Sequence, residues 1–508
     1  MTAMIRRLSG AARVAIAVAI AILPSAATAG SLLEGRVIDR TLANGMRVLL
    51  VERPAVPTVS YNVTFRVGSV NERTGESGLA HLFEHMAFKG TTTIGTKDYA
   101  RERPLLDEID RLALEIQAEQ DKGRAADATR LAELRTRFEA LQDEARALVA
   151  PNELGIVYDR NGAAGLNAST GVDVTRYTVS LPANRLPLWV AVESDRMTRP
   201  VFREFYTERA VVQEERRMRV DNNPGGKLYE AFAAAAFTAH PYGVPTIGWA
   251  SDVDHLTAPR AREFFDRHYG PANAVIAIVG DLDAEKTFQQ VAAAFGAIPA
   301  RPAPPPVVTL EPAQAGERRI EVEYDAQPQM LIGYHKPDIN DPDDPVFDVI
   351  ESLLSSGRTS RLYTSLVKTR QIAVAASASS GEPGARYPNL FTLEAVPRAP
   401  HTLDEVEAAL LAEVDRLQRE DVPARELDKV LNRLDAALIR SLQSNSGLAS
   451  QLAYFEAVAG DWRYLLRIRD RMAAVTPEDV RRVAAAWLVK RNRTVARLVP
   501  PVVEKAAP

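Results

Sequence analysis

The sequence has 508 residues, 46% of them hydrophobic and 25% charged, a globular composition that excludes a wholly disordered or fibrous chain. Lysine and arginine total 62 against 66 aspartate and glutamate, and this near balance gives no electrostatic reason to expect nucleic-acid binding. Cysteine is absent, which excludes disulfides, thiol nucleophiles and cysteine-based zinc or iron–sulfur sites.

The first 29 residues have the pattern of a secretory signal peptide. Arg6 and Arg7 form a positive region, residues 15–23 are apolar, and small residues ending at Ala29 form a cleavage site. We expect cleavage after Ala29 and a mature protein in a bacterial periplasm; the alternative is an uncleaved membrane anchor. No later segment offers about 18 uninterrupted apolar residues, so we expect no stable membrane span in the mature chain.

Strand-like and helix-like segments are mixed along the whole chain. Asn44-Gly45 separates two apolar runs and predicts a β-hairpin. The predicted strands are 36–39, 47–51, 60–67, 176–181 and 274–279, and the predicted helices are 78–88, 187–197 and 201–220. This mixture favours an α+β fold, with mostly antiparallel sheets and packed helices, over a doubly wound parallel sheet.

The two halves of the chain are related in sequence and are separated by a stiff, proline-rich segment at 301–306. In each half a threonine precedes a helical stretch, an asparagine and an apolar strand. Thr257 and Thr476 are 219 positions apart, as are Asn273 and Asn492, which indicates a duplicated domain. We expect a signal peptide at 1–29, a catalytic domain at 30–300, a linker at 301–316, a homologous non-catalytic domain at 317–500 and a tail at 501–508.

Residues 102–150 show apolar residues at heptad spacing in two stretches, with Lys122-Gly123 between them. Charged residues fill the other positions, which predicts an antiparallel pair of helices with a coiled-coil seam. Pro151 ends the second helix. We expect a helical-hairpin insertion in the catalytic domain with a structural or partner-binding role; a substrate lid is the alternative.

The strongest chemical signal is His81-Leu82-Phe83-Glu84-His85. Residues i and i+4 of a helix share one face, so both imidazoles can reach one ion, with Glu84 beside them. Zinc accepts such nitrogen and oxygen ligands, and a catalytic zinc keeps one position open. The alternative is a helix with two histidines of no chemical role, but the chain has only seven histidines, which makes a chance match rare.

A catalytic zinc needs a third protein ligand, and the predicted helix at 201–220 offers carboxylates. Glu208 and Glu215 are seven residues apart, about two helical turns, so they lie on one face. One of them can bind zinc while the other orients a histidine ligand. Spacing alone leaves Glu208, Glu214 and Glu215 open as the ligand.

The stretch from Gly78 to Thr91, GLAHLFEHMAFKGT, resembles the active-site helix of the pitrilysin/insulinase family. The likeness is strongest to the mitochondrial-processing-peptidase branch, and these enzymes are inverzincins, whose metal motif reverses the usual order. The resemblance extends over residues 35–500. It implies two homologous α/β sandwich domains and an enclosed chamber that favours unfolded peptides.

The resemblance also implies a role for each candidate residue. His81, His85 and Glu215 would bind one Zn²⁺ per chain, Glu84 would act as general base on the zinc-bound water, and Glu208 would orient the ligands. The segment Asn167, Ala168, Ser169 and Thr170 resembles the edge strand along which family substrates lie. We therefore expect a periplasmic zinc-dependent endopeptidase or oligopeptidase.

The chain departs from the family pattern in its second half. Family members carry an arginine and a tyrosine, seven residues apart, that bind substrate, whereas this chain has Val367 and Val374 at the matching positions. Valine has no side-chain hydrogen-bond donor. We therefore expect a heterodimer with a homologous subunit that supplies the Arg/Tyr pair; a homodimer is the alternative. Two other functions stay open, namely a non-catalytic assembly subunit and a protease dedicated to maturing one precursor.

Overall fold

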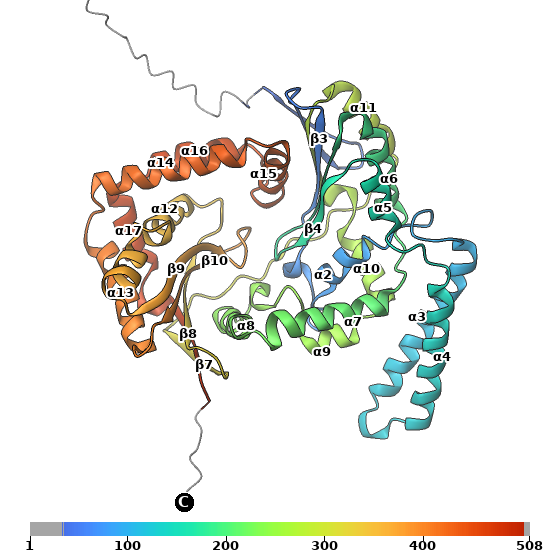
Figure 1. Cartoon of the computed structure of the whole chain (residues 1–508), viewed down its shortest axis with the longest axis horizontal. Coiled ribbons are helices and arrows are strands. Elements are labelled where there is room, and N and C mark those ends of the chain that lie inside the picture. Colours follow the sequence, from blue (N-terminus) through green and yellow to red (C-terminus); the bar gives the residue numbers. More distant parts are fainter. Residues whose placement is uncertain (1–32, 34, 502–508) are drawn as a thin grey trace, which may run out of the picture.

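The computed structural model describes residue 33 and residues 35–501 (Figure 1). The predicted signal peptide at 1–29 and most of the predicted tail lie outside the described residues. Each half of the chain forms one β-sheet packed against helices, which confirms the predicted α+β fold class. Within the described part of the chain, no helix has the length and apolar character that crossing a membrane requires.

The first sheet has six strands in the order β1-β2-β6-β3-β5-β4. β2 and β6 run parallel, and the other neighbouring pairs run antiparallel. The strands are β1 (Val37–Thr41), β2 (Arg47–Glu52), β3 (Thr58–Phe65), β4 (Ala164–Thr170), β5 (Thr175–Pro182) and β6 (Ala274–Gly280). The predicted hairpin joins β1 to β2 where Gly45 adopts a φ of 90°. All residues of β6 are buried because the sheet has apolar clusters on both faces.

Helices of the first half, apart from the hairpin at 102–150, lie between and after these strands in the sequence. They are α2 (Leu79–Met86), α5 (Glu153–Arg160), α6 (Leu186–Thr198), α7 (Phe205–Arg216), α8 (Pro224–Ala236), α9 (Ala250–His255), α10 (Ala258–His268) and α11 (Ala284–Phe295). The predicted helix at 201–220 differs from the structure, because α7 ends at Arg216 and a π-helical turn, η4 (Arg217–Asp221), follows it. In this turn the amide of Asn222 donates to the carbonyl of Arg217, five residues earlier.

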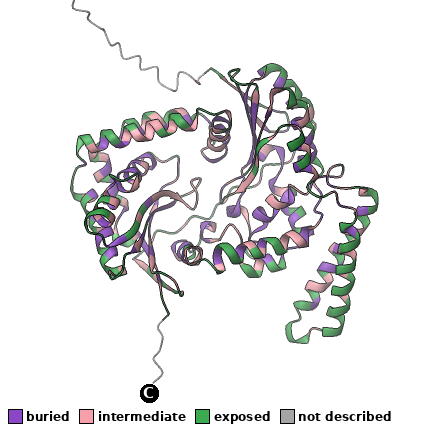
Figure 2. Ribbon diagram, viewed as in Figure 1, coloured by how far each residue is buried: buried purple, intermediate pink, exposed green. Residues whose placement is uncertain are grey.

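The predicted hairpin at 102–150 corresponds to two long helices, α3 (Tyr99–Gln120) and α4 (Ala128–Arg146). They lie antiparallel and project from the first half of the chain (Figure 1). Ile109, Ala113 and Ala145 are buried and belong to the apolar core of the first half, whereas most of α4 is exposed (Figure 2). The base therefore belongs to the core of the first half, and the distal part does not.

The second sheet has five strands in the order β7-β11-β8-β10-β9. Its strands are β7 (Arg318–Glu323), β8 (Gln329–Lys336), β9 (Ala373–Glu382), β10 (Asn389–Pro397) and β11 (Arg493–Val499). The helices of this half are α12 (Asp344–Ser355), α13 (Leu403–Arg419), α14 (Ala424–Ser441), α15 (Asn445–Val458), α16 (Tyr464–Ala473) and α17 (Pro477–Trp487), and the π-helical η7 (Tyr363–Thr369) precedes β9.

The two halves repeat the same architecture. In each sheet the last strand, β6 or β11, lies between a parallel and an antiparallel neighbour. The 219-residue spacing found in the sequence holds for the starts and ends of whole elements, since α10 corresponds to α17 and β6 to β11. The structure therefore supports a duplication, while the exact domain boundaries stay a prediction.

Each half contributes one helix to the sheet of the other half. α15 of the second half packs on β3 and β6 of the first sheet, where Leu448 and Leu452 join Leu49 and Val275 in one apolar cluster. α8 of the first half packs on the second sheet, against β7, β8 and β11. This exchange buries an apolar face of each sheet in the opposite half, so neither half would keep its core if it were separated.

Candidate metal centre

The helix that carries the histidine motif, α2, is capped at its N-terminus by a side chain that precedes the helix in sequence. Its first residue follows Gly78, which adopts a φ of 92° and has no side chain to cap the helix. Instead the carboxylate of Glu72 accepts hydrogen bonds from the amides of Gly78 at 2.8 Å and Ala80 at 2.7 Å. A Cβ atom at Gly78 would lie 2.9 Å from the carbonyl oxygen of Ile247. Both features fix where α2 begins.

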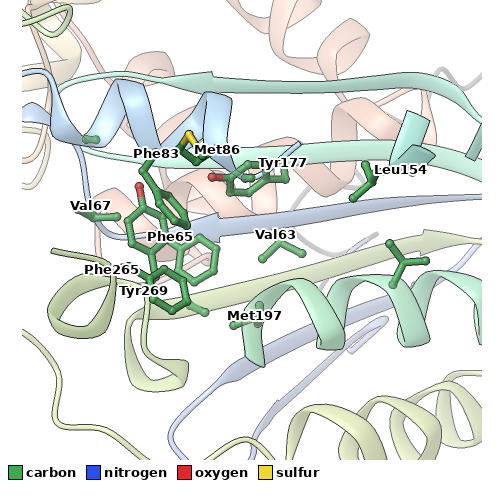
Figure 3. Close-up of a cluster of buried hydrophobic side chains, with 14 of the residues drawn as sticks. Val63, Phe65, Val67, Phe83, Met86, Leu154, Tyr177, Met197, Phe265 and Tyr269 are labelled. Atoms are coloured by element: carbon green, nitrogen blue, oxygen red, sulfur yellow. The ribbon is translucent and has the colours of Figure 1, made fainter. Parts of the chain in front are cut away.

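One face of α2 is buried in the core, which directs the opposite face toward α7 and β4. Phe83 and Met86 point into an aromatic cluster (Figure 3). The ring of Phe83 lies 4.1 Å from that of Tyr269 and 5.1 Å from that of Phe265, measured between centroids. This packing fixes the rotation of α2 about its axis, so the side chains of the motif face α7.

His81, His85 and Glu215 come together between α2 and α7, with one ligand atom from each within 4.8 Å of the others. Oε2 of Glu215 lies 3.6 Å from Nε2 of His81 and 3.5 Å from Nε2 of His85. A tetrahedral zinc with bonds of about 2.1 Å keeps its ligand atoms about 3.4 Å apart. The three residues therefore fit a zinc ion in spacing and in donor chemistry.

The two histidines of the cluster have different surroundings. Burial lowers the pKa of His81 to about 3, so this imidazole is neutral and available as a ligand at neutral pH. His85 places Nδ1 at 3.2 Å from Oε2 of Glu208, and this hydrogen bond raises the pKa of His85. With the Nδ1 hydrogen donated to Glu208, the lone pair on Nε2 is directed toward Glu215.

Glu208 is held as a carboxylate by contacts on both of its oxygens. Oε1 lies 2.6 Å from the ammonium of Lys89, which also donates to Glu204 at 2.9 Å. Burial alone raises the pKa of Glu208, but the hydrogen bonds from His85 and Lys89 outweigh burial, and the net pKa lies below its usual value. An ionised Glu208 keeps its acceptor role toward His85 at neutral pH.

Glu84 borders the same cavity as the two histidines. Its Oε2 accepts a hydrogen bond of 2.6 Å from the hydroxyl of Thr170, the last residue of β4. Burial raises the pKa of Glu84, and the hydrogen bond from Thr170 opposes that rise. A carboxylate with a raised pKa, close to a metal site, is suited to accept and return a proton.

The predicted substrate segment 167–170 lies on β4, which is an edge strand and pairs with β5 alone among the described strands. All four residues line a cavity of about 950 Å³ that also contains His81, Glu84 and His85. The structure thus brings the predicted edge strand and the predicted metal ligands to one cavity.

The geometry distinguishes the three carboxylates, Glu208, Glu214 and Glu215, that sequence spacing left as candidate metal ligands. Glu214 points away from the histidines and pairs with Arg217 at 3.0 Å, with 56% of its side chain exposed. Glu215 faces the histidines, and Glu208 contacts only one of them. Sequence reasoning missed the roles of Lys89, four residues after His85, and of Arg219, four residues after Glu215, although helical i,i+4 spacing offered a signal for both.

Among the described residues of the second half, no group of metal-ligating side chains corresponds to this site. Positions 219 residues after Glu208 and Glu215 are Leu427 and Leu434, and both pack in the apolar core of that half. Val367 is partly buried against the same core, and Val374 is half exposed at the start of β9. Leucine side chains thus stand in the second half at the positions that correspond to Glu208 and Glu215.

Family models match both halves. The model described as Insulinase (Peptidase family M16) matches residues 47–122, and the model described as Peptidase M16 inactive domain matches residues 255–434. The zinc protease PqqE of Helicobacter pylori is 26% identical over 467 residues, which cover 91% of this chain and 92% of that protein. An uncharacterized zinc protease of Streptomyces coelicolor is also 26% identical, over 90% of this chain and 88% of its own.

Solved structures agree with the sequence comparisons. A protease from Helicobacter pylori superposes with a TM-score of 0.77 at 25% identity, covering 91% of this chain and 99% of that chain. The periplasmic protease PqqL from Escherichia coli shares the fold, with a TM-score of 0.67 at 19% identity. The superposition covers 93% of this chain but only 49% of the PqqL chain. The matches to both halves, together with full-length relatives named zinc proteases, show that this chain belongs to the insulinase (M16) peptidase family.

Proposed function

We propose that the protein is a periplasmic zinc-dependent endopeptidase or oligopeptidase that hydrolyses unfolded peptides. The observation that carries this proposal is the cluster of His81, His85 and Glu215 with Glu84 on the same cavity. Relatives over nearly the whole chain are named zinc proteases, which supports the activity. The signal-peptide pattern of the first 29 residues supports the location.

In the proposed mechanism His81, His85 and Glu215 hold the ion. A bound zinc would supply Lewis-acid polarisation of the scissile carbonyl and would acidify a water molecule. Glu84 accepts the proton of the attacking water and returns it to the leaving amine. The hydroxyl of Thr170 donates a hydrogen bond to Oε2 of Glu84, which leaves Oε1 for this proton transfer. Glu208 keeps His85 in the tautomer whose Nε2 can bind metal.

The peptide substrate would bind as an additional strand beside β4. The free edge of β4 offers main-chain donors and acceptors along residues 167–170, next to Glu84. Strand addition relies on main-chain hydrogen bonds and therefore accepts many sequences. It also requires an extended peptide, which explains why an unfolded substrate suits this cavity.

We further propose that the active form is a heterodimer with a homologous subunit that carries the Arg/Tyr substrate-binding pair. Val367 and Val374 offer no hydrogen-bond donor, and one of them is turned into the core. This chain matches about half of the PqqL chain, which is compatible with a second unit of similar size. Purification from the native host tests the partner: a homodimer that cleaves peptides as fast as the native complex would contradict it.

The activity is tested with a peptide library, using mass spectrometry of the products. We expect internal cleavage by the wild-type protein with zinc and none by the Glu84→Gln variant. Cleavage of one host precursor and of no library peptide would favour the dedicated maturation protease. Intact peptides with every preparation, including the native complex, would overturn the proposal and favour the assembly subunit.

A further inference from the structure

The two carboxylate oxygens of Glu215 have different partners. Oε2 faces the histidines, whereas Oε1 lies 2.8 Å from a guanidinium nitrogen, Nη1, of Arg219. The Arg219 side chain is 69% exposed and lines the cavity of the metal centre. Among the described residues that line this cavity, it is the only arginine or lysine, and Glu84 and Glu215 line the same cavity.

The backbone that carries Arg219 is fixed by the neighbouring helix. Arg219 lies in the π-helical turn η4, and the start of α8 packs against this turn. A Cβ atom at Gly226 would lie 2.0 Å from the carbonyl oxygen of Arg219, so only glycine permits this approach. Arg216, the residue before η4, restrains the start of this turn. It donates to the carbonyl of Gly248 at 2.7 Å and pairs with Glu230 of α8 at 2.7 Å.

We propose that Arg219 is a positioning residue that holds Oε1 of Glu215 and thereby presents Oε2 alone to the zinc ion. This inference rests on the proposed metal site. The guanidinium nitrogen that lies 2.8 Å from Oε1 forms an ion pair with this oxygen, and that attraction opposes rotation of the carboxylate plane. The same positive charge offsets the repulsion between Glu84 and Glu215 when no metal is bound.

Arg217 provides a matched control on the same turn. It pairs with Glu214 at 3.0 Å, and its side chain is 58% exposed. Both arginines are therefore exposed partners of a glutamate on α7, but only Arg219 contacts the carboxylate that faces the histidines. Loss of a positive charge or of surface packing would change zinc binding alike in variants of Arg217 and of Arg219. Loss of ligand orientation would change it in the Arg219 variant alone.

The test is the zinc affinity of the full-length protein, measured by competition with a chromophoric chelator and without substrate. We expect Arg219→Gln to weaken zinc binding about 10- to 100-fold, the range for residues that orient metal ligands. Arg219→Lys should recover part of the loss because an ammonium keeps a positive charge next to Oε1, and Arg217→Gln should bind as the wild type does. Thermal unfolding of the metal-free proteins should be alike, since both positions are on the surface.

A second measurement reports the coordination itself. With Co²⁺ in place of zinc, the visible absorption spectrum depends on the number and geometry of ligands. We expect a changed spectrum in Arg219→Gln and an unchanged one in Arg217→Gln. Equal zinc affinity and equal spectra for Arg219→Gln and wild type would overturn the positioning role. Failure of the wild-type protein to bind zinc would overturn the proposed metal site itself, so the two failures are distinguishable.

Discussion

The hydroxyl of Thr170 donates a hydrogen bond of 2.6 Å to Oε2 of Glu84. The last residue of an edge strand thus fixes a carboxylate of the helix that carries the metal motif. The two elements are brought together by the fold, because 86 residues separate them in sequence. This contact links the site where a peptide strand would bind to the group that would transfer the proton.

We expect Thr170→Val to lower kcat about tenfold while the zinc content stays unchanged. One hydrogen bond to a charged group contributes about 1.5 kcal/mol or more, and its loss frees the carboxylate to rotate. Ser169→Ala is the control, because Ser169 lines the same cavity but bonds to Arg176 and not to Glu84. Equal losses in both variants would show that the strand, and not the hydrogen bond, matters.

Glutamate-to-glutamine substitutions should separate metal binding from proton transfer. Glu215→Gln is expected to lose zinc, whereas Glu214→Gln should retain it, because Glu214 pairs with Arg217 and lies away from the histidines. Glu84→Gln should retain zinc but lose at least about 100-fold in turnover, the low end for loss of general acid–base catalysis. Metal analysis and peptide hydrolysis are measured on the same preparations. Full zinc content in Glu215→Gln would move the ligand role to another carboxylate.

The helical hairpin should be dispensable at its tip but not at its base. Nη2 of Arg130 and Oε2 of Glu115 lie 4.0 Å apart, which shows that α3 and α4 still face each other at this level. A Gly/Ser bridge between the two helices can therefore replace residues 114–131. Because Ile109 and Ala145 remain, we expect this shortened protein to keep its fold and its zinc. Loss of zinc on shortening would show that the tip supports the metal centre.

At the base of the hairpin, Glu102 and Arg203 form an ion pair of 2.8 Å with 0% and 1% of their side chains exposed. Arg203 also donates to the carbonyls of Thr91 and Ile94 in the loop that follows α2. Glu102→Ala leaves a buried, unpaired guanidinium and should lower the free energy of unfolding by about 3–5 kcal/mol. Glu108→Ala on the exposed face of α3 is the control and should leave stability nearly unchanged in denaturant titrations.

His268 should contribute to acid sensitivity. This side chain is 5% exposed, and burial lowers the pKa of His268 to about 4. The folded state therefore binds fewer protons than the unfolded state between pH 6.5 and about 4, so the stability contribution is present above 6.5 and is lost as the pH falls. The difference between the unfolded and folded pKa of His268 corresponds to about 3 kcal/mol in the free energy of unfolding.

The measurement compares His268→Phe with the wild type in unfolding experiments from pH 7 to pH 4. The variant cannot take up this proton, so its stability should fall less over that range, whatever its stability at pH 7. A parallel decline of the two proteins would show that His268 does not titrate in this way.

The sequence by itself determined the features that depend on local periodicity. His81, Glu84 and His85 share a helical face because of their spacing, and that holds wherever the helix packs. The hairpin at 102–150 followed from its heptads, and the duplication from a constant 219-residue offset. Each of these rests on residues close in sequence or on direct comparison of two segments.

The tertiary structure decided which distant side chains meet. Glu214 and Glu215 are neighbours, and only the rotation of α7 against α2 turns one toward the histidines and the other toward solvent. The exchange of α8 and α15 between the two sheets likewise left no local signal, because an apolar helix face does not specify its partner. The contacts of Thr170 with Glu84 and of Lys89 with Glu208 join separate segments of the chain, and long-range packing alone fixes such distances.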